Sequence, residues 1–194
     1  MVAFLVYSCG GKLSQADLEK LSSLPVQSVT DMVVIQNENG RLVMRMEAGK
    51  MERYDRDTVA FESFPSGITV YSYNEDEKLE TIITADRAVH DSKQKKDMDI
   101  WNAYGNVVVE NLINHQVLET DTLFWDSGNE RIWTESYVQL YSSDGYMQGY
   151  GMVSDQKARN SIIKKPFNSY GYVQKDTTEF AVDTVNFIGP MLKN

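Results

Sequence analysis

The sequence predicts an all-β protein built from antiparallel strand pairs. From residue 29 onward, short runs of alternating apolar and polar residues are separated by turn residues at fairly even spacing, which is typical of half-buried strands. Segments with helical periodicity are almost absent from the same stretch. An internal repeat, described below, further indicates that the strand pairs stack on one another in chain order.

Length and charge limit the classes of function. The chain has 194 residues, of which 42% are hydrophobic, and a chain of this size buries roughly 70% of its unfolded surface on folding. We therefore expect one domain with a substantial core. The 19 Lys and Arg against 28 Asp and Glu give a net charge of −9, and no stretch gathers basic residues into a stripe that could follow phosphates. Nucleic acid is therefore excluded as a partner, and so is simple electrostatic docking on an anionic membrane.

The N-terminus has the layout of a bacterial lipoprotein signal. An apolar run from Met1 ends at Ser8, directly before Cys9, the only cysteine of the chain. The run is far shorter than the ~20 apolar residues of a membrane-spanning helix. We therefore interpret residues 1–9 as the end of a cleaved export signal, with lipidation at Cys9 as the membrane anchor. The alternative is an unmodified cysteine after a short buried strand. The Ser-rich residues 10–28 are predicted to be a linker.

The individual strands are delimited by their turn residues. Nearly every break contains Gly, Asn or Asp, which tolerate positive φ or close Asx-turns. The predicted strands are residues 32–36, 42–46, 68–73, 79–88, 98–104, 107–111, 116–125, 132–141, 146–153 and 161–163.

Three of these segments repeat one another. Residues 83–91, 118–126 and 147–155 each read as a strand that closes on an aspartate, at Asp91, Asp126 and Asp155. Units of this length cannot bury an apolar face alone, so they are expected to stack around a continuous core. The three aspartates should then lie along one rim. In the same alignment, His90 occupies the position that Trp125 holds in the next copy.

Strand alternation assigns an inward face to the repeat. It places Trp101, Val107 and Val109 on one side of the sheet, followed by Leu118 and, after a local bulge, by Leu123 and Trp125. Leu140 continues the same side. For each of these residues, plain core packing and contact with a bound lipid are both open. Phe64 is a candidate for ligand contact because it precedes Pro65-Ser66-Gly67, where packing should be loose.

No pattern in the chain predicts catalysis. Neither His90 nor His115 has a His, Cys or carboxylate at metal-ligand spacing, and Gly149-Tyr150-Gly151 lacks the third glycine and the following helix of a phosphate loop. That segment is instead expected to form a bulge or a close approach of two backbones. We therefore predict a protein that is not an enzyme and that has no metal and no cofactor.

Taken together, the ordered motifs resemble those of the LptC family and the related OstA-like domains, over residues 29–173. The resemblance rests on Glu38-Asn-Gly40, residues 46–55, Phe64 with residues 68–73, Thr84-Ala-Asp-Arg-Ala88, Tyr104-Gly-Asn-Val-Val-Val109, Leu118-Glu-Thr-Asp121, Trp125-Asp126, residues 132–134 and 138–140, and Asp144-Gly145 through Gly149-Tyr-Gly151. Residues 174–194 have no counterpart and leave room for one more strand. Better-known family members begin with a transmembrane helix, whereas the Cys9 signal is predicted at this place here.

The resemblance implies an open, twisted antiparallel β-jellyroll or sandwich of repeated strand pairs, located in the periplasm and held at the inner membrane by its lipid anchor. Its apolar groove would shelter the lipid A acyl chains of lipopolysaccharide. The partners would be an LptBFG-like ABC transporter and an LptA-like bridge protein, joined through the two sheet edges. The groove residues would be Phe64, Val70, Trp101, Val107, Val109, Leu118, Leu123, Trp125 and Leu140, and the partner edge would be Ser161, Ile162 and Ile163.

Two other classes of function stay open at this point. The first is a surface or periplasmic lipoprotein that binds polysaccharide on exposed aromatic side chains, since the chain has 11 Tyr and 3 Trp. A closed sandwich with exposed Tyr and Trp would favour it. The second is a β-helix-like hydrolase with paired aspartates. It would require two carboxylates that converge in a cleft, which the repeat argues against.

Overall fold

The computed structural model describes residues 24–55, 60–91, 99–174 and 180–181, and it confirms the all-β fold class. Cys9 and most of the predicted linker lie outside the described residues. The strands are β1 (Gln27–Glu38), β2 (Arg41–Asp55), β3 (Ala60–Phe64), β4 (Ile68–Tyr73), β5 (Leu79–Ala85), β6 (Arg87–Asp91), β7 (Ile100–Asn111), β8 (Gln116–Asp126), β9 (Arg131–Ser142), β10 (Gly145–Asp155), β11 (Ile162–Pro166), β12 (Tyr170–Gly171), β13 (Val173–Gln174) and β14 (Phe180–Ala181).

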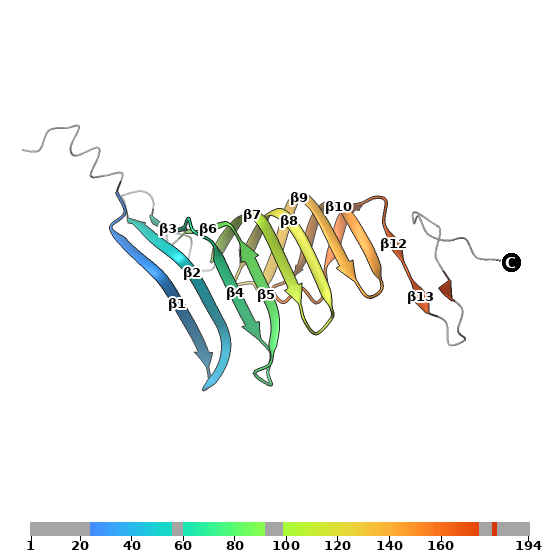
Figure 1. The fold of residues 1–194 in the computed structure, drawn as a ribbon, viewed down its shortest axis with the longest axis horizontal. Coiled ribbons are helices and arrows are strands. Elements are labelled where there is room, and N and C mark those ends of the chain that lie inside the picture. The colour runs from blue at the N-terminus through green and yellow to red at the C-terminus, as the bar shows by residue number, and fades with distance from the viewer. Residues whose placement is uncertain (1–23, 56–59, 92–98, 175–179, 182–194) are drawn as a thin grey trace, which may run out of the picture.

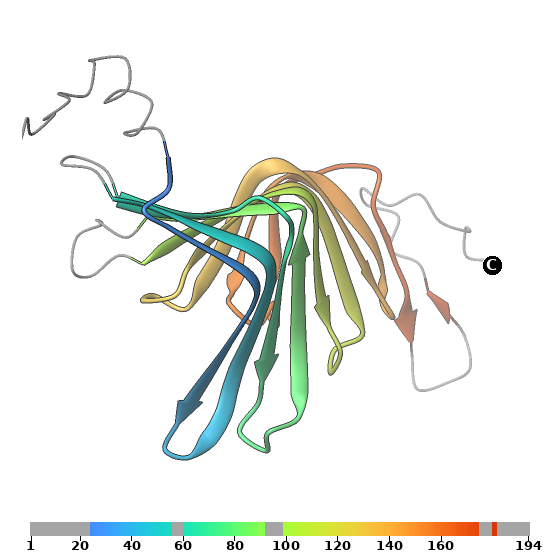
Figure 2. The ribbon, with the colours of Figure 1, turned by 60° about the vertical axis from the view of Figure 1, so that its left-hand side comes forward.

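One antiparallel sheet folds into two layers because its long strands bend. On one side of β7, residues 101–104 pair with β6 and residues 108–111 pair with β5. The long strand β2 likewise pairs with β3 through residues 52–55 and with β4 through residues 44–48. We call the layer that contains β3 and β6 layer A, and the layer that contains β4 and β5 layer B. The strands β7 to β10 run through both layers, and the result is an arch (Figures 1 and 2).

The bends of successive strands line up in a ridge, where the two layers meet. Several ridge residues adopt the left-handed backbone region, among them Asp31 (φ 51°), Gly67 (86°), Gly105 (75°) and Gly151 (75°). A side chain at Gly105 would place its Cβ 2.8 Å from the carboxylate of Asp86, and this close approach requires glycine. The registers of β7–β8 and β9–β10 shift at the same level, so the ridge is a row of β-bulges that turn layer A into layer B.

The apolar core lies between the two layers. Inward-facing residues of nearly every strand from β2 to β11 form a single buried cluster, with Val29, Met32, Met44, Trp101, Ala103, Trp125 and Met147 packed against it. The alternation read from Trp101 to Val109 therefore points inward, as predicted. The bulge predicted between Leu118 and Leu123 is also confirmed, because the β8–β9 register shifts between Thr120 and Phe124.

Three strand predictions need correction. Gly105 and Asn106 do not separate two strands, because β7 continues through them with a bulge. The predicted strand at residues 79–88 is instead two strands, β5 and β6, with a bend at Asp86 that sends them into different layers. The short strand β3 was missed. At the C-terminal end, β13 and β14 form a separate two-stranded sheet, and residues 175–179 and 182–194 lie outside the described part of the chain.

Candidate functional site

The nine residues predicted to line a groove all lie in the interior between layers A and B. Seven of them are buried side chains of the core cluster, and Trp101 and Trp125 are half-buried and packed against it. Phe64 is only 1% exposed, so its side chain lies within the core. The structure therefore brings the predicted set together on one continuous apolar surface whose own side chains fill the space between the layers.

The half-buried part of this surface is a row of stacked rings in layer A. His90 on β6, Trp101 on β7 and Trp125 on β8 are directly opposite one another across their strands. The ring of Trp101 lies 4.3 Å from His90, 5.9 Å from Trp125 and 5.4 Å from Phe64, measured between centroids. His90 and Trp125 thus hold equivalent positions in the repeat, as the sequence alignment predicted.

The polar atoms of His90 are held by two carboxylates. Its Nδ1 lies 3.3 Å from Glu62 and its Nε2 lies 2.5 Å from Asp99. Asp99 also accepts a hydrogen bond from the hydroxyl of Ser127. These contacts hold the imidazole ring against Trp101, which gives His90 a structural role at the end of the aromatic row.

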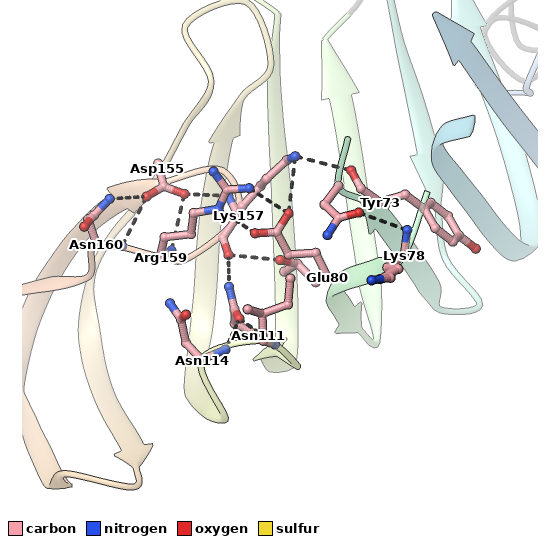
Figure 3. A network of polar contacts seen from close by, with 12 residues as sticks. Tyr73, Lys78, Glu80, Asn111, Asn114, Asp155, Lys157, Arg159 and Asn160 are labelled. Carbon is pink, nitrogen blue, oxygen red and sulfur yellow. Dashed lines mark hydrogen bonds and ion pairs between the residues drawn. The ribbon is translucent and has the colours of Figure 1, made fainter. Parts of the chain in front are cut away.

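The loop after β10 crosses from layer A to layer B, and we call residues 156–160 the strap (Figure 3). It leaves layer A at Asp155, the last residue of β10. It reaches Glu80 and Thr81 at the start of β5, Asn111 at the end of β7 and the carbonyl of Tyr73 at the end of β4, all on the free rim of layer B. The strap therefore spans the mouth of the arch, on the side away from the ridge.

An ion pair fixes the strap to layer B. Glu80 is 2% exposed, and the guanidinium of Arg159 donates to both of its carboxylate oxygens, over 2.5 and 2.8 Å. The ammonium of Lys157 lies 3.3 Å from the same carboxylate. The hydrogen bond from Arg159 lowers the pKa of Glu80 below its usual value and outweighs the opposing effect of burial. Glu80 is therefore an ionised carboxylate that is both buried and paired.

Backbone and core contacts hold the middle of the strap. The carbonyl of Lys157 accepts hydrogen bonds from the Thr81 hydroxyl (2.9 Å) and from the Asn111 amide (2.7 Å). Ala158 is 4% exposed and belongs to the core cluster. Towards layer A, the indole N–H of Trp125 donates to the side chain of Gln156 over 3.2 Å. The strap thus closes the interior and also packs into it.

The sheet has two free edges in the described part of the chain. At one end, β1 pairs only with β2, and Val33 and Ile35 are more than half exposed. At the other end, β11 pairs only with β10. Of the predicted edge residues, Ile162 is 64% exposed, Ile163 is buried against the core, and Ser161 precedes the strand and contacts Ser154. The exposed backbone side of β11 is therefore an edge of the kind that another strand can join.

The aspartates of the repeat lie along one rim, as predicted. Asp91, Asp126 and Asp155 end the strands β6, β8 and β10, which run in the same direction in layer A. Asp126 accepts hydrogen bonds from the backbone and side chain of Asn129, and these bonds lower its pKa. In the described ranges, no group of three or more His, Cys, Asp or Glu is arranged to hold a metal ion.

A hollow of about 580 Å³ lies beside the ridge at the N-terminal end of the arch. Its lining includes the outward-facing Val33, Glu47 and Thr69, together with Asp86 and Asn106. None of the nine predicted groove residues takes part in it. The hollow does reach core side chains at that end of the arch, those of Ala48, Ile68 and Ala85.

The strap is the part of the site that sequence reasoning missed. Its residues read as a polar turn after the repeated aspartate, and Glu80 occurs in a strand whose alternation does not mark it as buried. The one sequence feature that could have indicated the strap was Asp155, the aspartate that ends the third copy of the repeat. Asp155 accepts hydrogen bonds from the backbone N–H groups of Lys157, Arg159 and Asn160, a compact loop that a repeated Asp turn permits.

The comparisons with known proteins agree with this geometry. The model of one family, described as "Lipopolysaccharide-assembly, LptC-related", matches residues 1–165. No curated protein matches the chain. The described part of the chain contains no apolar helix of membrane-spanning length. An all-β arch with an apolar interior, together with a family match over most of the sequence, shows that the chain belongs to the LptC-related family of lipopolysaccharide-assembly proteins, whose role is in lipopolysaccharide transport in the cell envelope.

Proposed function

We propose that the protein is a non-catalytic carrier in lipopolysaccharide export, which holds the lipid A acyl chains between layers A and B and passes them from an LptBFG-like ABC transporter to an LptA-like bridge protein. The observation that carries the proposal is the continuous apolar surface between the layers. It draws on both layers and reaches the mouth at the half-buried indoles of Trp101 and Trp125.

Acyl chains suit this interior because it offers apolar contact almost throughout. Each methylene group removed from water contributes about 0.8 kcal/mol, so several long chains together bind strongly without any directional contact. The interior is filled in the present state, with Val107 and Val138 at 0% exposure. Binding would therefore require the two layers to move apart at the mouth while the ridge keeps them joined.

The two free edges would supply the protein contacts. An extended strand from a partner can pair with β1 or with β11, and each added hydrogen bond contributes about 0.5–1.5 kcal/mol net. A partner sheet that adds at β11 and the neighbouring β12 would also extend the interior of the arch, because these two strands pair with successive parts of β10 at the end of the sheet. We assign the bridge protein to the β11 edge and the transporter to the β1 edge.

Lipidation at Cys9 would anchor the protein to the inner membrane on its periplasmic face. The predicted linker at residues 10–28 would then separate the anchor from β1. Catalysis is not part of the proposed role, since Glu80 and Asp126 both serve as hydrogen-bond acceptors that hold loops. The energy for transport would come from the transporter.

Photo-crosslinking in living cells tests the groove. A photoreactive phenylalanine analogue placed at Trp101 or Trp125 should crosslink to lipopolysaccharide, detected by immunoblotting. Trp133 provides a matched control, because it stacks on Phe124 under the guanidinium of Arg131 and points away from the core. Equal crosslinking from Trp133 and from the two inner positions would contradict the proposal.

The edge assignment is tested by a charge at an exposed position of β11. Ile162→Lys should weaken capture of the bridge protein, because a lysine in an edge strand opposes pairing with another strand. Ile113→Lys is the control, since Ile113 is similarly exposed but lies in the β7–β8 turn. If the two variants capture the bridge protein equally well, β11 is not the edge that binds it.

A further inference from the structure

The outer side of layer B carries two rows of aromatic side chains at the C-terminal end of the arch. Val138 and Leu140 face inward on β9, so Tyr137, Gln139 and Tyr141 face outward. The neighbouring strand β10 repeats the pattern with Tyr146, Gln148 and Tyr150. Tyr146 is directly opposite Tyr141, and Tyr150 is opposite Tyr137. We call this surface the aromatic face; its rings are those of Tyr137, Tyr141, Tyr146, Tyr150, Phe167, Tyr170 and Tyr172.

The first row runs along the rim of layer B. The centroid of Tyr146 lies 5.1 Å from that of Tyr141 and 5.9 Å from that of Tyr170, and Tyr172 lies 5.7 Å beyond Tyr170. Four phenol rings from β9, β10 and the β12 segment thus follow one another across neighbouring strands. The row lies next to the turn at residues 143–144, at the mouth of the arch.

The second row lies nearer the ridge. Tyr137, Tyr150 and Phe167 form a triangle with centroid separations of 5.7, 5.9 and 6.2 Å. Tyr137 and Tyr141 are four residues apart on one strand, which corresponds to about 13 Å between the rows. The amides of Gln139 and Gln148 fill the space between them: Gln139 donates to the Tyr146 hydroxyl, and the Tyr137 hydroxyl donates to Gln148.

The aromatic face is exposed, uncharged and rich in hydroxyl groups. Five of its seven rings are 36–53% exposed, and neither the rings nor the two amides carry a charge. Burial raises the pKa of Tyr137 to about 12 and also raises the pKa of Tyr141, so both phenols stay protonated. Among the described residues, the hydroxyls of Tyr150, Tyr170 and Tyr172 make no hydrogen bond, and they are free for a ligand.

From this arrangement we propose that the aromatic face is a saccharide-binding site, which takes the neutral sugar rings of the ligand's headgroup. The C–H groups on one side of a pyranose ring carry partial positive charge, and they stack on the negative face of an aromatic ring. Tyrosine hydroxyls and glutamine amides then pair with the hydroxyl groups of the sugar. A face without charged side chains in its two rows suits a neutral polyhydroxylated ligand better than a phosphate or an acidic peptide.

The position of the face relates it to the groove. The first row borders the same rim of layer B that bounds the mouth, so a glycolipid can place acyl chains inside the arch and lay its sugars over the rim. The inference rests on the proposed function for the identity of this ligand. It extends that function, because the lipid interior and the saccharide site contact different parts of one molecule.

The test uses two separate probes on the full-length protein: core oligosaccharide freed of lipid A, and lipid A without the core oligosaccharide, each titrated by calorimetry. The double variant Tyr141→Ala/Tyr170→Ala should lose at least tenfold in oligosaccharide affinity and keep its affinity for lipid A. Tyr170→Phe, which keeps the ring, should lose less than the double variant. Tyr54→Ala is the control, because Tyr54 stacks with Phe61 at the opposite end of the arch.

The outcomes separate the two proposals. Wild-type protein that fails to bind oligosaccharide, or a double variant that binds it as well as wild type, overturns the saccharide site. A double variant that keeps its oligosaccharide affinity and loses capture of the bridge protein identifies the face as a protein interface, which also overturns it. Failure of lipid A to bind while oligosaccharide does bind overturns the groove and leaves the saccharide site in place.

Discussion

The two ends of the arch are packed differently. In the N-terminal half, β1 to β6, the inward residues Met46, Ala48, Met51, Ile68 and Val70 are 5–8% exposed. In the C-terminal half, β7 to β12, Val107, Val109, Leu118, Ile132 and Val138 are 0–1% exposed, whereas Leu140 and Ile163 are 6–7% exposed. The strap starts at β10 in the C-terminal half and reaches across to β4 and β5 in the N-terminal half. The apolar side chains at 0–2% exposure therefore lie in the C-terminal half, apart from Phe64, and we refer to the C-terminal half as the closed half and to the N-terminal half as the open half.

The side chains of the two halves suit this difference. Met32, Met44, Met46 and Met51 face the interior of the N-terminal half, and unbranched methionine side chains adapt to irregular contents. Branched Val, Leu and Ile dominate the interior of the C-terminal half; χ1 is stiff in the β-branched Val and Ile, and close packing of such side chains is specific.

The largest expected effect is the cost of a cavity in the closed half. Leu118→Ala should lower the free energy of unfolding by about 4 kcal/mol, because its surroundings are too well packed to collapse. Met46→Ala in the open half should cost only about 2 kcal/mol. Urea unfolding of both variants measures the difference, and equal losses would show that the two halves do not differ in packing.

The next effect concerns the strap. Arg159→Met leaves the buried Glu80 with Lys157 as its remaining cationic partner. The substitution should therefore lower the free energy of unfolding by about 2 kcal/mol. A larger loss is not expected, because the Arg159 side chain is half exposed. Hydrogen exchange should become faster at residues 156–160 and stay unchanged in β1 and β2. A variant with wild-type stability and exchange would mean that the strap does not clamp the mouth.

The same ion pair should appear as a pH dependence. Arg159 lowers the pKa of Glu80 from its usual 4.5, so the pair stabilises the folded state fully above that value and progressively less as the pH falls below it. The difference in unfolding free energy between wild type and Arg159→Met should therefore be largest near pH 7 and shrink towards about pH 3. A difference that stays constant over this range would assign the effect of Arg159 to packing alone.

The smallest expected effect comes from the exposed ion pair of Lys164 with Glu135 on the ridge. Lys164→Met should change the unfolding free energy by less than about 0.5 kcal/mol, since exposed pairs are screened and cost side-chain entropy. It serves as the matched control for Arg159→Met, because both changes remove one cation from one carboxylate. A loss as large as that of Arg159→Met would show that the strap has no special role.

Strand alternation and turn chemistry were sufficient to predict the inward face and the rim. Period-two spacing was enough to predict that Trp101, Val107 and Val109 face the interior of the sheet. The end of β8 could be predicted at Asp126 because its carboxylate closes a turn. The bend at Asp86 could not be read in the same way, since the adjacent polar residues Asp86 and Arg87 do not by themselves distinguish a bend from a continuous strand. It arises because β5 and β6 pair with different parts of β7, which is a tertiary constraint.

The strap and the aromatic face escaped prediction for a related reason. The pattern Tyr-x-Gln-x-Tyr occurs twice in the sequence, at residues 137–141 and 146–150, but only the register between β9 and β10 makes two continuous rows of it. Glu80 looked like an ordinary polar position, and its burial depends on a loop 79 residues away. The face on which a strand residue lies can be predicted from local spacing, whereas a contact between two segments across the mouth, such as that of Glu80 with Arg159, cannot.

That long separation bears on the order in which the molecule folds. Most strand pairs join neighbours in the sequence, so the ridge and both layers can form by adding one hairpin after another as the chain becomes available. The ion pair between Glu80 and Arg159 joins residues that are 79 positions apart in the sequence. Contacts between such distant residues form late in folding, because closing the loop costs conformational entropy before the contact stabilises the chain. The interior should therefore stay open to solvent or to lipid until the last strands are in place, so that the mouth closes as the final step of folding.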